Sequence, residues 1–257
     1  MAIDTDKNGY TMLFSIAMVV VVGSLLAFLA SSLSERIKEN ERFEKQQNIL
    51  YAMGVNENTP DSGVNFIPTD VVEEKFTERI KKQYVLVGAE KNTAAPANVE
   101  EDDQAFLIDV RKQLAALKKG EEARLPIFVG EKEGEEVYVL PMYGKGLWDA
   151  IWGFVSVDKN MIIQGVYFDH KQETAGLGAN IKMRFFMDDF IGESLLDGNS
   201  YRGVEVSKTN NDPLNEDKED NAVDAIAGAT ITGNGVSNMI KETLRAYKPY
   251  LETIRTN

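Results

Sequence analysis

The stretch IFVGEKEGEEVYVLPMYGKGLWDAIWGFVSVDKNMIIQGVYFD, residues 127–169, sets the architecture of this chain. It contains four runs of β-branched and aromatic residues, at 127–130, 137–143, 150–157 and 162–169. Short segments rich in Gly, Asp and Asn lie between these runs, as is typical of turns. The stretch therefore predicts consecutive strands of an antiparallel sheet.

Helices are expected both before and after these strands in the sequence. After them, the sequence predicts a helix at 180–190, a strand at 204–207, a polar loop at 209–221 and a closing helix. Apolar residues of the closing helix recur every three or four positions, at Val236, Ile240, Leu244, Tyr247, Leu251 and Ile254. Before the strands, a helix passing into a strand is expected at 71–86 and a further helix at 105–117. The fold class predicted is α+β, with helices packed on an antiparallel sheet.

Residues 10–33 carry no charge and are mainly aliphatic or aromatic. As a helix these 24 residues would extend about 36 Å, enough to cross a hydrocarbon core of about 30 Å. A cleaved signal peptide is the alternative, but the start carries Asp4 and Asp6 beside Lys7, and the apolar run is long for a signal. We therefore expect one transmembrane helix, continued by a charged helix from Ser34 to about Leu50.

Four regions follow from these patterns. Residues 1–9 form the amino terminus before the span, 10–33 the span, 34–103 a membrane-proximal helix and linker, and 104–257 the main domain. Orientation is less simple. Arg36, Lys38, Arg42 and Lys45 follow the span and only Lys7 precedes it, so the positive-inside rule alone would put the main domain in the cytoplasm.

Composition excludes several classes of function. The 257 residues include 28 basic and 41 acidic side chains, a net charge of −13, which argues against nucleic acid as a partner. The chain has no cysteine, so disulfides, iron–sulfur clusters, zinc-thiolate sites and cysteinyl flavin are excluded. Its one histidine, His170, excludes a multi-histidine metal centre. We expect no metal ligand and no catalytic residue.

Residues 224–235, DAIAGATITGNG, set Thr230 in a small-residue loop ahead of the closing helix. If that helix begins near residues 233–235, its free N–H groups and the positive end of its dipole favour a phosphate at Thr230. Gly228 and Ala229 leave room for a large ligand. The alternative is an ordinary helix entry with Thr232 or Asn234 as the N-cap.

Two other loops sit at predicted strand ends. In residues 143–149, YGKGLWD, Lys145 can neutralise a phosphate and Trp148 offers a flat face to an aromatic ring, although a hairpin with a buried Trp fits the same pattern. Residues 170–180, HKQETAGLGAN, lead into a helix that Asn180 would cap. His170 is either a proton donor or a structural hydrogen-bonding residue.

Asp224, two spacers, a small residue and then Gly-Ala-Thr-x-Thr resemble the motif at which flavin transferases attach FMN to threonine by a phosphoester. The acceptor maps onto Thr230, while Ala227 departs from the usual Ser or Thr. With the span, the Gly-Lys-Gly-Leu-Trp loop and the His-x-x-Glu-Thr-x-Gly-Leu-Gly loop, nearly the whole chain resembles the C subunit of the sodium-translocating NADH:quinone oxidoreductase. The G subunit of the ion-translocating ferredoxin:NAD complex shares the His-x-x-Glu-Thr-x-Gly-Leu-Gly loop and the Gly-Ala-Thr-x-Thr site. The long segment 60–120 and the full Gly-Lys-Gly-Leu-Trp-Asp sequence favour the former family.

The resemblance implies a single-pass flavoprotein of the bacterial inner membrane, with residues 1–9 in the cytoplasm and its FMN-binding domain, residues 104–257, in the periplasm. It implies that other subunits handle NADH, quinone and sodium, that this chain relays electrons, and that a flavin transferase is a partner during maturation. The alternative is a membrane-anchored scaffold without cofactor. The resemblance assigns the covalent bond to Thr230, the attachment motif to Asp224, and the surroundings of the flavin to Lys145, Trp148, Glu173, Thr174, Gly176, Leu177, Gly228, Ala229 and Thr232.

Overall fold

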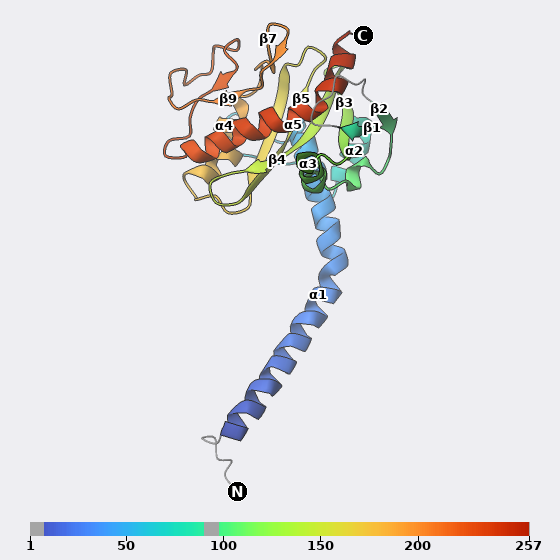
Figure 1. The fold of residues 1–257 in the computed structure, drawn as a ribbon, viewed down its shortest axis with the longest axis vertical. Coiled ribbons are helices and arrows are strands. Elements are labelled where there is room, and N and C mark those ends of the chain that lie inside the picture. Colours follow the sequence, from blue (N-terminus) through green and yellow to red (C-terminus); the bar gives the residue numbers. More distant parts are fainter. Residues whose placement is uncertain (1–7, 90–97, 257) are drawn as a thin grey trace. The chain divides into compact units, whose positions relative to one another are not determined.

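The computed structural model of the chain describes residues 8–89 and 98–256. The chain divides into two compact units, residues 1–45 and 46–257 (Figure 1). Most of the predicted amino-terminal segment 1–9 lies outside the described residues. The predicted boundary between residues 103 and 104 stays a prediction.

The helix α1, Asn8–Ala52, runs through the predicted span and the charged residues after it without a break. It is long and apolar enough to cross a membrane, and the side chains of its apolar window are not covered by protein. Leu13 and Phe28, for example, are exposed. Because these side chains gain nothing from facing water, their burial requires lipid or partner helices.

The last residues of α1 belong to the core of the second unit. Ile49, Leu50 and Ala52 are fully buried. The Ser156 hydroxyl donates a 2.6 Å hydrogen bond to the carbonyl of Ala52, and a Cβ added to Gly165 would lie 2.4 Å from the same oxygen. This close backbone approach explains the glycine and joins the end of α1 to the sheet.

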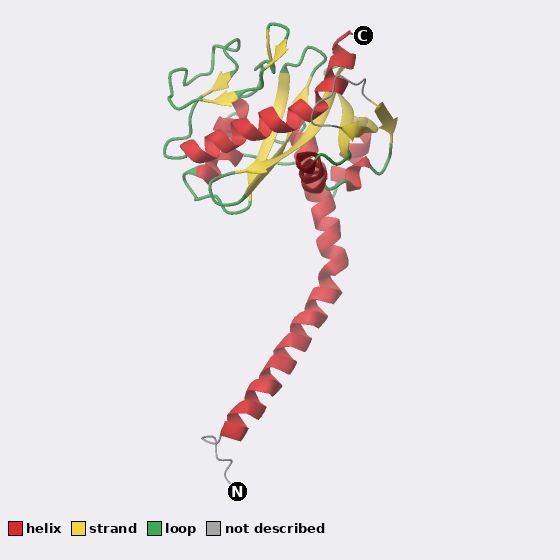
Figure 2. Cartoon of the chain, in the orientation of Figure 1, coloured by secondary structure: helices red, strands yellow, loops and turns green. Residues whose placement is uncertain are grey.

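The sheet has six antiparallel strands in the order β2-β1-β3-β4-β5-β6. Figure 2 shows the strands in yellow and the helices in red. The predicted antiparallel sheet is confirmed. The four strands predicted within residues 127–169 are neighbours joined by short connections. The strands are β1 Ile80–Ala89, β2 Asn98–Glu101, β3 Ala123–Lys132, β4 Glu135–Lys145, β5 Ala150–Val157 and β6 Ile163–His170.

Helices cover both faces of this sheet. The long helix α5, Thr230–Thr256, packs chiefly on β4, and its predicted apolar face is buried from Val236 to Leu251. Tyr138 of β4 meets Tyr250 of α5 edge to face, while Ser156 of the next strand reaches α1 from the opposite side of the sheet. The remaining helices are α2 Val72–Arg79, η1 Ala105–Leu107, α3 Val110–Lys119, η2 Gly178–Lys182 and α4 Arg184–Asp188.

The predicted helix at 180–190 is wrong as a single element. Met183 is extended, with φ −83° and ψ 145°, and separates η2 from α4. The break lets Phe186 and Phe190 pack against Phe168, with ring centroids 6.0 and 5.1 Å away. Asn180 is therefore not a helix cap but lies within η2, where its side chain donates to the carbonyl of Gly176.

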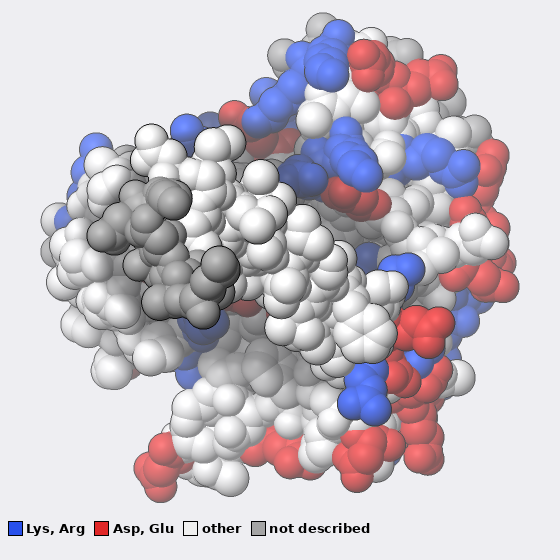
Figure 3. All heavy atoms as spheres, turned by 90° about the horizontal axis from the view of Figure 1, so that it is seen from below, with Lys and Arg blue, Asp and Glu red and all other residues white. Residues whose placement is uncertain are grey.

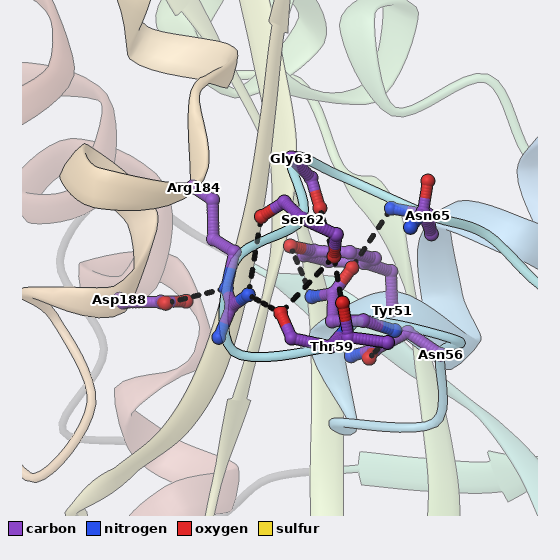
Figure 4. Close-up of polar contacts among 9 residues, drawn as sticks. Tyr51, Asn56, Thr59, Ser62, Gly63, Asn65, Arg184 and Asp188 are labelled. Atoms are coloured by element: carbon purple, nitrogen blue, oxygen red, sulfur yellow. Dashed lines mark hydrogen bonds and ion pairs between the residues drawn. The ribbon is translucent and has the colours of Figure 1, made fainter.

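Side chains of α1 and α4 contact the polar loop at residues 56–65, which follows α1 (Figure 4). Arg184 pairs with Asp188 at 2.9 Å and donates to the carbonyls of Thr59 and Ser62. Tyr51, in the last turn of α1, accepts a hydrogen bond from the Asn58 side chain at 3.0 Å. Hydrogen bonds to Tyr51 of α1 and Arg184 of α4 thus hold this loop in place.

The residues between α4 and α5 form short ladders. They are β7 Leu196–Asp197 with β8 Ser200–Tyr201, and β9 Glu205–Val206 in parallel with β10 Ala222–Val223. On the face drawn in Figure 3, basic and acidic side chains of the described residues are interspersed.

Candidate functional site

The closing helix begins earlier than the glycines suggest. Thr230 is its first residue, and the Gly233 N–H donates to the carbonyl of Ala229 at 2.9 Å. The expected start at residues 233–235 is wrong because those glycines serve packing: a Cβ on Gly235 would lie 2.5 Å from the carbonyl oxygen of Lys145. Thr230 is exposed and stands in the first turn, where backbone N–H groups have no partner within the helix.

Thr232 is not the N-cap of this helix. Its side chain is 1% exposed, and its hydroxyl donates a 2.6 Å hydrogen bond to Oε2 of Glu173. Asn234 lies in the second turn and is not a cap either. The N-cap position falls on Ala229, after Gly228 with φ +71°, a left-handed conformation that glycine adopts without strain.

Glu173 joins two of the candidate loops to the helix. Its side chain is 7% exposed, and Oε1 accepts the backbone N–H of Trp148 at 3.0 Å. The indole N–H of Trp148 donates to the hydroxyl of Thr174 at 3.1 Å. The Trp148 side chain is 64% exposed, so the alternative of a buried core tryptophan is wrong.

Leu177 lies against the turn that precedes Thr230. A Cβ on Gly228 would be 2.9 Å from Cδ2 of Leu177, and Gly176 takes a left-handed φ of +77° to make the loop bend. Four large apolar side chains are exposed on the two loops and in the first turn of α5: Leu147, Trp148, Leu177 and Ile231. Monomeric surfaces rarely gather such side chains without a ligand or a partner.

The other predicted residues have definite places. Lys145 is exposed at the end of β4, and its backbone contacts α5 at Gly235. Asp224 accepts the N–H of Asp212 through Oδ1, while its buried Oδ2 has no hydrogen-bond partner within the described residues. His170 accepts the N–H of Glu173 at Nδ1, a structural hydrogen bond that shapes the turn.

A buried acid that no sequence pattern indicated lies beneath the loop that carries Asp224. Glu193 is fully buried, and Oε1 accepts from Asn215 at 3.2 Å and lies 3.8 Å from the Lys218 ammonium. Burial raises the pKa of Glu193 to about 7 and that of Asp189 to about 6. A glutamate between Gly192 and Ser194 looks like a surface residue, so only the fold could reveal its burial.

Comparisons with known proteins agree with this geometry. Residues 146–245 match the FMN-binding domain family, a range that holds most of the three loops. The C subunit of the Na(+)-translocating NADH-quinone reductase from Yersinia pestis is 26% identical, with 98% of this chain and 95% of that protein aligned.

Solved structures are similar too. The crystal structure of the C subunit of the Na(+)-translocating NADH-quinone reductase from Parabacteroides distasonis is 30% identical, with a TM-score of 0.67 over 85% of this chain and 96% of that one. The chain belongs to the NqrC family, the C subunits of Na(+)-translocating NADH-quinone reductases. NqrC from Shewanella oneidensis, at 22% identity and a TM-score of 0.62, has the same fold. The α+β fold predicted for this NqrC chain, with its long apolar amino-terminal helix, is confirmed.

Proposed function

We propose that this chain is the electron-relay subunit of a Na(+)-translocating NADH-quinone reductase and carries FMN joined to Thr230 by a phosphoester. The position of Thr230 carries the proposal: it is exposed at the first turn of α5. Two residues before it, Gly228 lies against Leu177, and two residues after it, Thr232 is joined through Glu173 to the loop of Trp148. The match to FMN-binding domains and the full-length similarity to NqrC proteins support the same assignment.

The residues around Thr230 fit a phosphate. The first N–H groups of α5 are free for a ligand, and the helix dipole stabilises a negative charge there. Lys145 adds a positive side chain from the strand end that contacts α5 at Gly235. Gly228 and Ala229 contribute almost no side-chain bulk at the tether.

The apolar side chains around Thr230 fit a flat ring. The indole N–H of Trp148 donates to the hydroxyl of Thr174, which restrains the exposed ring. Leu177 lies beside Gly228 and is itself exposed. When bound, FMN supplies one- and two-electron chemistry, and the part of the protein is to hold and tune the ring. Electron entry from NADH, quinone reduction and sodium export then belong to other subunits, and a flavin transferase installs the FMN.

The intact mass of the chain tests the assignment. Purified from a host with the flavin transferase, the chain should exceed its sequence mass by one FMN less one water, because the ester replaces a hydroxyl and a hydrogen. Proteolytic fragments should place this increment on the peptide with Thr230. A mass equal to that of the sequence would support the cofactor-free scaffold instead.

We propose further that the second unit lies in the periplasm and α1 in the inner membrane. The four basic residues after the span oppose this orientation, but the positive-inside rule weakens for large translocated domains. Because the chain has no cysteine, Lys208→Cys, at an exposed position, provides a single reactive thiol. A membrane-impermeant maleimide should label it in cells with a permeabilised outer membrane and an intact inner membrane, whereas Asn8→Cys should react only after lysis. The reverse pattern would place the domain in the cytoplasm.

A further inference from the structure

One buried carboxylate connects the three loops of the candidate site. Oε1 of Glu173 accepts the N–H of Trp148, and Oε2 accepts the hydroxyl of Thr232. Thr232 lies two residues after Thr230, in the same helical turn. Two hydrogen bonds through Glu173 therefore connect the helical turn of Thr230, the proposed attachment residue, to Trp148, the proposed platform for the flavin ring.

The protein leaves space for this carboxylate and for little else. A Cβ on Gly146 would lie 2.4 Å from Oε1, and a Cβ on Gly178 would lie 2.4 Å from Oε2 and 2.5 Å from the Thr232 hydroxyl. These two glycines line the carboxylate from the loops on either side. The backbone N–H of Glu173 is itself held by Nδ1 of His170.

Both partners of Glu173 act as donors, and the 2.6 Å distance between the Thr232 hydroxyl and Oε2 lies in the range of O–H···O bonds to a carboxylate. As a carboxylate, Glu173 places a negative charge behind the loop that presents Trp148. An anionic form of a reduced ring at this loop would be destabilised by that charge.

We propose that Glu173 is a positioning residue for the flavin: it locks the Trp148 loop to the helical turn of Thr230 and places a negative charge behind the ring. The inference rests on the proposed attachment of FMN to Thr230. This role is separate from a direct contact with the ring, because each carboxylate oxygen accepts a hydrogen bond from the protein and Glu173 is buried.

Three variants of the full chain separate the effect of the two hydrogen bonds of Glu173 from the effect of its negative charge. Thr232→Val removes the hydroxyl with little change in shape, and Thr232→Ser restores it. Glu173→Gln keeps both hydrogen bonds if its amide oxygen accepts from Trp148 and its amide N–H donates to the Thr232 hydroxyl, but it removes the charge. FMN content by mass, flavin fluorescence anisotropy and the flavin midpoint potential are measured for each.

We expect Thr232→Val to lower the anisotropy of the flavin and to raise its fluorescence, because the ring platform loosens, and Thr232→Ser to restore both values. Glu173→Gln should leave the flavin anisotropy near that of the original sequence and shift the midpoint potential of the flavin upward. Flavin properties that stay unchanged in Thr232→Val and Glu173→Gln, even with a loss of thermal stability, would overturn the proposal and leave Glu173 as a purely structural residue.

A measurement without flavin covers the case in which a variant is not modified. In a Trp152→Phe background, Trp148 is the only tryptophan, and its quenching by acrylamide reports on the loop. Thr232→Val should increase this quenching and Thr232→Ser should not; equal quenching in both would overturn the lock. If the chain with its original sequence carries no FMN, the proposed function fails. If only the variants differ from expectation, the failure concerns the role of Glu173 alone.

Discussion

Replacing Thr230 with alanine should remove the covalent flavin completely and leave the protein folded. Only a hydroxyl at this position can form the phosphoester, and no other threonine of the sequence shares the Gly-Ala-Thr context. Thr230 is an exposed first-turn residue, so its truncation should change the free energy of unfolding by no more than about 0.5 kcal/mol. Loss of the mass increment, with an unchanged circular dichroism spectrum, is the expected result.

Thr209→Ala is the matched control, because Thr209 is an exposed threonine in a loop of the same domain. It should keep the full mass increment. Thr230→Ser keeps a hydroxyl and should be modified to a lower extent, since the missing methyl group leaves the hydroxyl less firmly oriented. Covalent flavin retained by Thr230→Ala would show that the attachment site lies elsewhere and would refute the assignment.

Glu193→Gln should stabilise the protein at pH 8 and reduce the dependence of its stability on pH. Because burial raises the pKa of Glu193 from 4.5 to about 7, the folded state binds more protons than the unfolded state between these values. Stability contributed by the protonated form is therefore full below about pH 4.5 and is lost as the pH rises through 7. The loss at pH 8 is on the order of 3 kcal/mol.

Urea unfolding of the full chain in detergent, followed from pH 4.5 to 8, measures this effect. Asp189, whose pKa burial raises to about 6, adds a change of the same sign, so Glu193→Gln should flatten the curve without abolishing its slope. The Lys218 ammonium keeps its hydrogen bond to the carbonyl of Asp189 in this variant. Glu216→Gln, at an exposed position in the loop that carries Lys218, should leave the slope unchanged. A variant at Glu193 that is less stable than the original chain at pH 8 would contradict the explanation.

Much of the fold follows from local patterns of the sequence. The runs at 127–130, 137–143, 150–157 and 162–169 became β3 to β6, because β-branched and aromatic residues between turn residues favour strands whatever lies around them. The apolar steps after Gly235 marked the buried face of α5. Two exceptions stand out. Gly233 and Gly235 lie inside α5 although their pattern predicts a helix start, and Met183 is extended where the spacing alone predicts a continuous helix.

The sequence by itself determined the apolar helix, the antiparallel strands, the excluded chemistries and the motif around Thr230, because each is written in the spacing and type of nearby residues. Only the tertiary structure decided that Glu173 meets Thr232, 59 positions away, and that Trp148 faces outward. It alone decided that Glu193 is buried. Hydrogen bonds and desolvation depend on which distant side chains the folded chain brings within a few ångströms, and no local pattern records that distance.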